Sequence, residues 1–131
     1  MDGTTGAARK QTQEREIGGT RYRLVVDQRD AQWVAHAERV DSGDRFGLEC
    51  SGESEGEALQ RLVRWIEWQS EHAAALAALQ QAERAYHRTI AGSAFVSATE
   101  GPSALELQRE SLDAVEQARV RLDDVRARKP E

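Results

Sequence analysis

Cysteine is almost absent from this chain of 131 residues, because Cys50 is the only one. A single cysteine excludes an intrachain disulfide and any zinc site built from several thiolates. Such sparse cysteine usage is typical of a reducing compartment, so we expect a cytoplasmic protein. No stretch approaches the roughly 18 apolar residues of a membrane span, and the first residues lack the apolar core of a signal peptide. We therefore expect no membrane association.

An excess of positive charge is also absent, since 18 Lys and Arg residues face 23 Asp and Glu residues, for a net charge of −5. This balance disfavours a globally basic nucleic-acid binder. The basic residues near the C-terminus also complement the dipole at the end of a helix. Asp123 and Asp124 interrupt this basic segment. Nucleic acid is thus the less favoured partner, and its candidate weak contacts are Arg119, Arg121, Arg126 and Arg128.

Two nucleotide-binding motifs are missing as well, since the sequence has no phosphate loop and no dinucleotide fingerprint. The histidines are His36, His72 and His87. On one helix, His72 and His87 would lie about 22 Å apart, too far to share a metal ion. Cys50 falls on the apolar face of a predicted strand, where cysteine is usually an inert small hydrophobe. We therefore predict a non-enzymatic protein without catalytic residues, metal or cofactor.

Three segments show the alternation of apolar and polar residues that is typical of half-buried strands. They cover residues 21–27, 31–40 and 45–51, and short polar turns join them. Short turns favour antiparallel neighbours, so the pattern predicts a three-stranded antiparallel sheet. Residues 1–20 carry Ile17 as their single large aliphatic side chain apart from the initiator Met, and they are predicted to be a flexible leader.

A long helix is predicted from Glu57 to about Ile90, because this stretch contains neither proline nor glycine. Ser54 and Glu57 have the spacing of a capping box at its start. Such a helix spans about 50 Å, roughly twice the length of seven-residue strands. Its first turns are therefore expected to cover one face of the sheet, while the rest extends beyond it.

A second helix is predicted from Ser103 to about Arg128, after a loop over residues 91–102 that is rich in small residues. Its apolar stripe is narrow and suits one partner helix, so we predict an antiparallel helical hairpin over residues 71–131. The stripe consists of Leu105, Leu112, Val115, Ala118, Leu122 and Val125. The expected fold class is α+β. Ion pairs three residues apart are expected on the solvated side, namely Glu106–Arg109, Glu116–Arg119 and Asp123–Arg126.

The passage from the third strand into the helix, Ser51-Gly52-Glu53-Ser54-Glu55-Gly56-Glu57-Ala58-Leu59, resembles the small HicB-like antitoxin domain. That family has a three-stranded sheet and a Gly-x-Thr/Ser-x-x-Glu-Ala helix start, which Gly52, Ser54, Glu57 and Ala58 match. The resemblance covers residues 20–70, about half of the chain. The chain lacks the family's Pro-Asp-x-x-Gly-like segment and ends in a long helix in place of a short DNA-binding module.

The resemblance implies the shape of this β-β-β-α domain, taken as residues 21–70. It also implies an alternative function, that of an antitoxin or regulator which binds a small toxin partner or nucleic acid.

Trp65 and Trp68 lie three residues apart on the first helix and so share one side of it, and this side is a candidate surface for a partner. His72, Leu79 and Tyr86 continue this aromatic line. Together with an adjacent line of aliphatic residues it makes an apolar sector wider than one small sheet or one helix requires. One interpretation is that the sheet covers one line and the second helix covers the other. The other interpretation is a surface for a homodimer through the long helices, or for a protein partner. Its candidate residues are Trp65, Trp68, His72, Leu79, Tyr86, Leu112, Val115 and Leu122.

Overall fold

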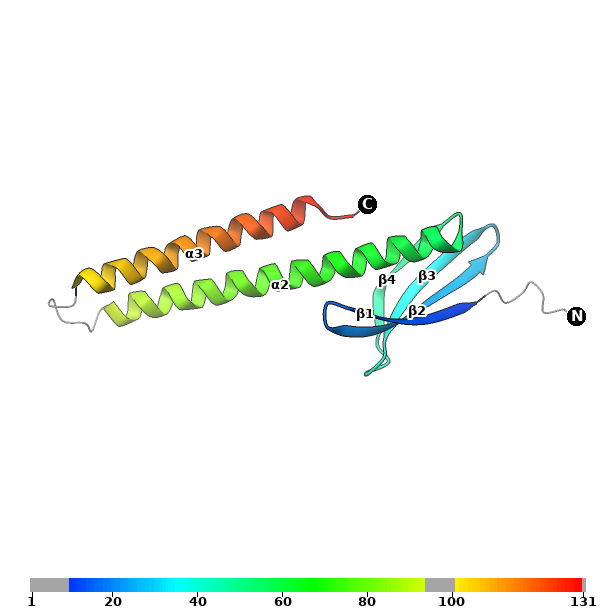
Figure 1. The fold of residues 1–131 in the computed structure, drawn as a ribbon, viewed down its shortest axis with the longest axis horizontal. Coiled ribbons are helices and arrows are strands. Elements are labelled where there is room, and N and C mark those ends of the chain that lie inside the picture. The colour runs from blue at the N-terminus through cyan, green and yellow to red at the C-terminus, as the bar shows by residue number, and fades with distance from the viewer. Residues whose placement is uncertain (1–9, 94–100, 131) are drawn as a thin grey trace, which may run out of the picture. The chain divides into compact units, whose positions relative to one another are not determined.

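The computed structural model describes residues 10–93 and 101–130 and has the α+β architecture that the sequence predicts (Figure 1). The chain divides into two compact units, of which the first reaches Ser70 and the second runs from Glu71 to Lys129. The elements are β1 (Gln11–Ile17), β2 (Thr20–Arg29), β3 (Gln32–Arg39), β4 (Arg45–Gly52), α2 (Glu55–Ser93) and α3 (Gly101–Ala127).

The sheet of the first unit has four strands, not the three predicted, in the antiparallel order β1-β2-β3-β4. The additional strand β1 lies within residues 1–20, which were expected to be a flexible leader. It forms because Gly18 and Gly19, with φ of 59° and 83°, make a two-residue turn that pairs Ile17 with Thr20. Both central residues of this kind of hairpin turn need positive φ, which glycine adopts without steric cost.

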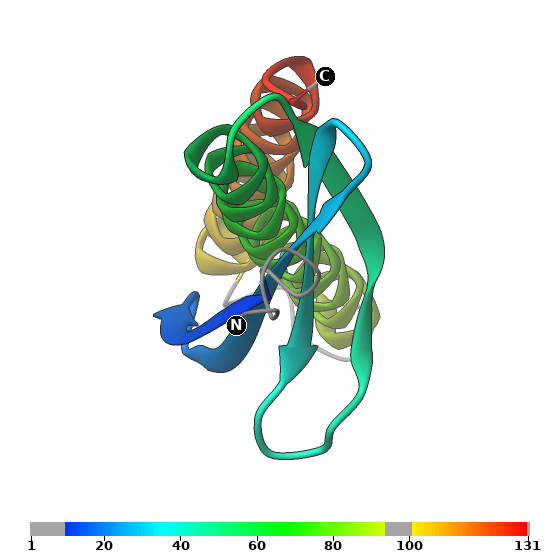
Figure 2. The ribbon, with the colours of Figure 1, turned by 90° about the vertical axis from the view of Figure 1, so that its right-hand side faces the viewer.

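The core of the first unit lies between the sheet and the first turns of α2. Figure 2 shows these turns against one face of the sheet, as predicted from the length of the helix. Leu24 of β2 and Leu62 of α2 are fully buried, and Ile66 is 1% exposed. The other buried members of this core are Ile17, Tyr22, Val26, Ala35, Ala37, Cys50 and Ala58.

The start of α2 has the predicted capping interactions. The backbone N–H of Glu57 donates to Ser54 Oγ at 3.1 Å, and the backbone N–H of Glu53 donates to Glu57 Oε1 at 2.8 Å. Two donors that the helix cannot pair internally are thereby satisfied. The capping interactions place the helix start directly after β4, so that Ala58, Leu62 and Ile66 reach the sheet.

The second unit contains the later part of α2 and all of α3. Helix α2 is unbroken, as predicted, and continues to Ser93, past the expected start of the loop. Residues 94–100 of that predicted loop lie outside the described residues. Arg128 Nη1 lies 3.7 Å from Glu71 Oε2, and Arg119 Nη2 lies 3.8 Å from Glu83 Oε2. Because the later residue of α3 pairs with the earlier residue of α2, these parts of the two helices run antiparallel.

Side chains from both helices are buried in the second unit. They are Ala75 of α2 and Val115, Leu122 and Val125 of α3. None of the three ion pairs expected within α3 is found among the described residues, and Arg119 reaches across to Glu83 instead of pairing with Glu116. Exposed pairs of this kind contribute little free energy, so solvation competes with them readily.

Candidate functional site

The described residues offer little for catalysis. Within residues 10–93 and 101–130 no group of three His, Cys, Asp or Glu side chains is placed to hold a metal ion. Burial raises the pKa of the Cys50 thiol, and the nearby Arg61 guanidinium offsets this only in part. The thiol therefore stays protonated at neutral pH and is a poor nucleophile.

In the described part of the chain, no helix is at once long and apolar enough to cross a membrane.

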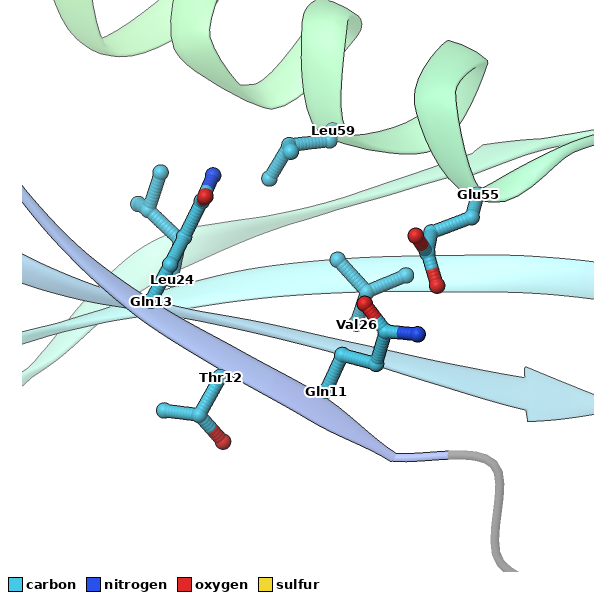
Figure 3. A pocket seen from close by; sticks show the side chains of 7 residues that line it. All are labelled: Gln11, Thr12, Gln13, Leu24, Val26, Glu55 and Leu59. Carbon is cyan, nitrogen blue, oxygen red and sulfur yellow. The ribbon is translucent and has the colours of Figure 1, made fainter.

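A small cavity opens between edge strand β1 and the first turns of α2 (Figure 3). Its volume is about 120 Å³. Leu24, Val26 and Leu59 provide apolar walls, while Gln11 and Gln13 bring amide groups. The remaining lining residues are Thr12 and Glu55. Ligand pockets usually exceed about 300 Å³, so this cavity suits a single side chain or a few waters better than a small-molecule ligand.

The sheet face that points away from α2 carries charges that pair with one another. Arg23 Nη1 lies 3.7 Å from Glu38 Oε1, and Arg45 Nη2 lies 3.0 Å from Glu49 Oε2. Further pairs join Arg21 to Glu14 at 4.0 Å and Arg29 to Glu49 at 3.4 Å. Because these arginines already face carboxylates, the face does not form the single-sign patch that a phosphate backbone requires.

The predicted aromatic line on α2 is partly covered. The rings of Trp65 and Trp68 meet edge to face, with centroids 5.8 Å apart and an interplanar angle of 81°. Both side chains are half-buried, as are those of His72, Leu79 and Tyr86. The line therefore does not form a fully exposed surface on the chain.

The three candidate residues of α3 separate in the structure. Val115 and Leu122 are each 3% exposed and pack inside the second unit, so they are not accessible to a partner in this structure. Leu112 is 40% exposed and stays accessible. Of the apolar stripe that helical periodicity predicted, Val115, Leu122 and Val125 are buried within the chain, whereas its earlier members Leu105 and Leu112 are exposed.

Large aliphatic side chains of α3 are exposed both on and off the predicted apolar stripe, since Leu105 and Leu112 belong to that stripe whereas Leu107 and Val120 do not. Leu105 and Val120 are each 68% exposed, and Leu107 is 54% exposed. Together with Leu112 of α3 and Ile90 of α2, these are the exposed large hydrophobic residues of the described chain, and all five lie in the second unit. Val120 stands between Arg119 and Arg121 in the sequence, so no apolar run marks it.

The four candidate nucleic-acid contacts also divide into two groups. Arg119 faces Glu83, and Arg128 faces both Glu71 and Asp124, the latter at 3.4 Å. Arg121 and Arg126 are exposed and form no ion pair within the described residues. Half of the predicted basic group is thus matched by carboxylates, which weakens its attraction for phosphate.

No protein-family model, curated protein or solved structure matches this chain. The resemblance to the HicB-like domain therefore depends only on the pattern of three strands and on the residues of the helix start.

Proposed function

We propose that this chain is a non-enzymatic interaction protein that forms a homodimer through the helices of its second unit. The observation that carries the proposal is the exposure of Leu105, Leu107, Leu112 and Val120 on the single helix α3. Scattered apolar residues are normal on a protein surface, but several on one helix are typical of an interaction site. Contact with a second copy on the side of α3 that carries Leu105, Leu112 and Val120 removes these three side chains from water, whereas Leu107 lies on another side of the helix.

The size of the second unit's core supports the same proposal. Two packed helices bury only one seam, and here the buried side chains among the described residues are Ala75, Val115, Leu122 and Val125. Pairing of two such helical units would form a four-helix arrangement with additional buried surface. The protonated thiol of Cys50 supports a role without covalent catalysis, and the single cysteine supports a cytoplasmic location.

Size-exclusion chromatography with light scattering tests this proposal on the full chain. We expect the wild type to have twice the monomer mass at micromolar concentration. The double variant Leu105→Ser/Val120→Ser should shift toward the monomer, because each dimer then loses four apolar side chains from its interface. Gln60→Ser, on the exposed side of α2 in the first unit, is the matched control and should leave the mass unchanged. A monomer throughout the micromolar range would contradict the proposal.

An antitoxin of the HicB-like kind is the second proposed function. It is supported by the helix start that carries the resemblance, where Ser54 and Glu57 form the capping hydrogen bonds and Gly52 lies against Ala58. The antitoxin proposal requires that an adjacent gene encode a small basic ribonuclease-like protein, and co-expression with that protein distinguishes the two proposals. A stoichiometric complex that survives purification supports the antitoxin function, and separate elution of the two proteins counts against it.

A further inference from the structure

One face of α3 carries an exposed row of alternating apolar and charged residues, here called the outer stripe. Its members follow one another at intervals of three or four residues, which places them on one side of a helix. All are exposed, and Leu105 and Val120 most clearly so at 68% each. The outer stripe consists of Leu105, Arg109, Leu112, Glu116, Val120 and Asp123, and the exposed Ala127 extends it by one turn.

The charged members of the outer stripe lack partners in the described chain. Arg109, Glu116 and Asp123 form no ion pair or side-chain hydrogen bond within residues 10–93 and 101–130. Arg119 and Arg128 on the same helix do face carboxylates of α2. The outer stripe therefore combines apolar side chains in water with charges of both signs that are available to another molecule.

The surface beside the outer stripe has the shape that a facing helix requires. Asp113, Glu116, Gln117 and Val120 border a shallow hollow on α3. Residues at positions i, i+3, i+4 and i+7 form the hole that receives a side chain of a partner helix in knobs-into-holes packing. These four residues have that spacing, so the hollow fits a side chain from a helix laid along α3.

Charge is distributed unevenly along α3, and this favours an antiparallel partner of the same sequence. Residues 101–118 contain four carboxylates and one arginine, a net charge of −3. Residues 119–129 contain five basic residues and two carboxylates, a net charge of +3. A second copy laid antiparallel brings each half against the half of opposite charge, whereas a parallel copy brings like charges together.

We propose that the outer stripe binds the outer stripe of a second copy, antiparallel, with the two-fold axis beside Glu116. This inference rests on the proposed homodimer and assigns its interface and register. The outer stripe is symmetric about Glu116, because Leu112 and Val120 lie four residues on either side of it and Arg109 and Asp123 lie seven residues on either side. In this register Leu112 faces Val120 of the second copy.

The same register sets the charge contacts. Arg109 faces Asp123 of the second copy twice in each dimer, once on either side of the axis. In a parallel, in-register dimer Arg109 would face Arg109 and Asp123 would face Asp123, which disfavours that arrangement. The antiparallel register has one unfavourable contact, since Glu116 of each copy lies at the axis and faces its equivalent.

Charge reversal on the full chain tests the register, with Kd measured by sedimentation equilibrium. Arg109→Asp and Asp123→Arg should each raise Kd at least about tenfold, because each places two like-charged pairs in the dimer. The double variant Arg109→Asp/Asp123→Arg restores opposite charges and should return Kd to within about threefold of the wild type. Arg121→Asp makes the same charge change away from the outer stripe and should leave Kd within about threefold.

Glu116→Gln tests the position of the axis. Removal of the like-charge contact should lower Kd about threefold or more. An unchanged or higher Kd overturns the placement of the axis, provided that circular dichroism shows the helical content of the wild type. If the wild type is a dimer but the double reversal fails to restore Kd, the register is wrong while the proposed homodimer stands. If the wild type is a monomer, both are wrong.

Discussion

Leu62→Ala should lower the free energy of unfolding of the first unit by about 3 kcal/mol. Leu62 is fully buried and packs in the core with Leu24 and Ile66, which are 0% and 1% exposed. The substitution removes apolar atoms from this core and leaves a cavity that the sheet and helix refill only in part. Urea denaturation followed by circular dichroism measures the loss.

Leu59→Ala is the matched control for this prediction. Leu59 is half-buried and lines the cavity beside β1, so its side chain already has open space on one side. We expect a loss of about 1 kcal/mol, well below that of the fully buried leucine. Equal losses for the two variants would show that Leu62 is not a central residue of the core.

Gly52→Ala should destabilise the first unit by about 2 kcal/mol or more, because the new methyl group has no space. A Cβ atom at Gly52 would lie 2.7 Å from the backbone nitrogen of Ala58 and 3.0 Å from the Cβ and Cγ atoms of Glu57. Relief of the contact with the backbone requires the first turn of α2 to shift. That shift also disturbs the hydrogen bonds of Glu57 with Ser54 and Glu53.

Gly47→Ala provides the comparison on the same strand, β4. A Cβ atom at Gly47 meets nothing within 4 Å, so the substitution introduces no contact. We expect unchanged stability or a gain of about 0.5 kcal/mol, since alanine loses less conformational entropy than glycine in a strand. Thermal or urea unfolding of both variants gives the result, and a comparable loss at Gly47 would mean that the packing of Gly52 against α2 is not the cause.

The two units differ in what they expose to solvent. In the first unit the face of the sheet that α2 covers holds the core, and the arginines of the opposite face lie against carboxylates. In the second unit α3 exposes Leu105 and Val120 beside Arg109, Glu116 and Asp123, which form no ion pair within the described ranges 10–93 and 101–130. This contrast is the reason for placing the proposed interface on the second unit.

Much of the first unit was predictable from residue patterns. The alternation in residues 21–27, 31–40 and 45–51 identified β2, β3 and β4, and every predicted strand end lies within two residues of the observed end. This difference is within the usual uncertainty of element boundaries. The capping pair Ser54 and Glu57 located the start of α2. These features are local, because each depends on neighbouring residues along the chain.

Strand β1 was missed because its side chains provide almost no apolar signal. Of its seven residues only Ile17 is buried. Its pairing with β2 comes from backbone hydrogen bonds and from the turn at Gly18 and Gly19, and neither leaves an alternating pattern in the sequence. The cavity beside β1 was missed for the same reason.

For the candidate site, helical periodicity predicted which residues form the apolar face of each helix. It did not predict which of these residues are covered by another part of the chain. Val115 and Leu122 were selected on periodicity and are buried, whereas Leu105 belonged to the same predicted stripe and is exposed; Val120, which the periodicity did not select, is exposed as well. Local composition thus determined the positions of the helices and of three strands, since turns, caps and alternation act over a few residues. Only the tertiary structure decided the pairing of β1 and the exposed face of α3, because burial depends on contacts between residues far apart in the chain.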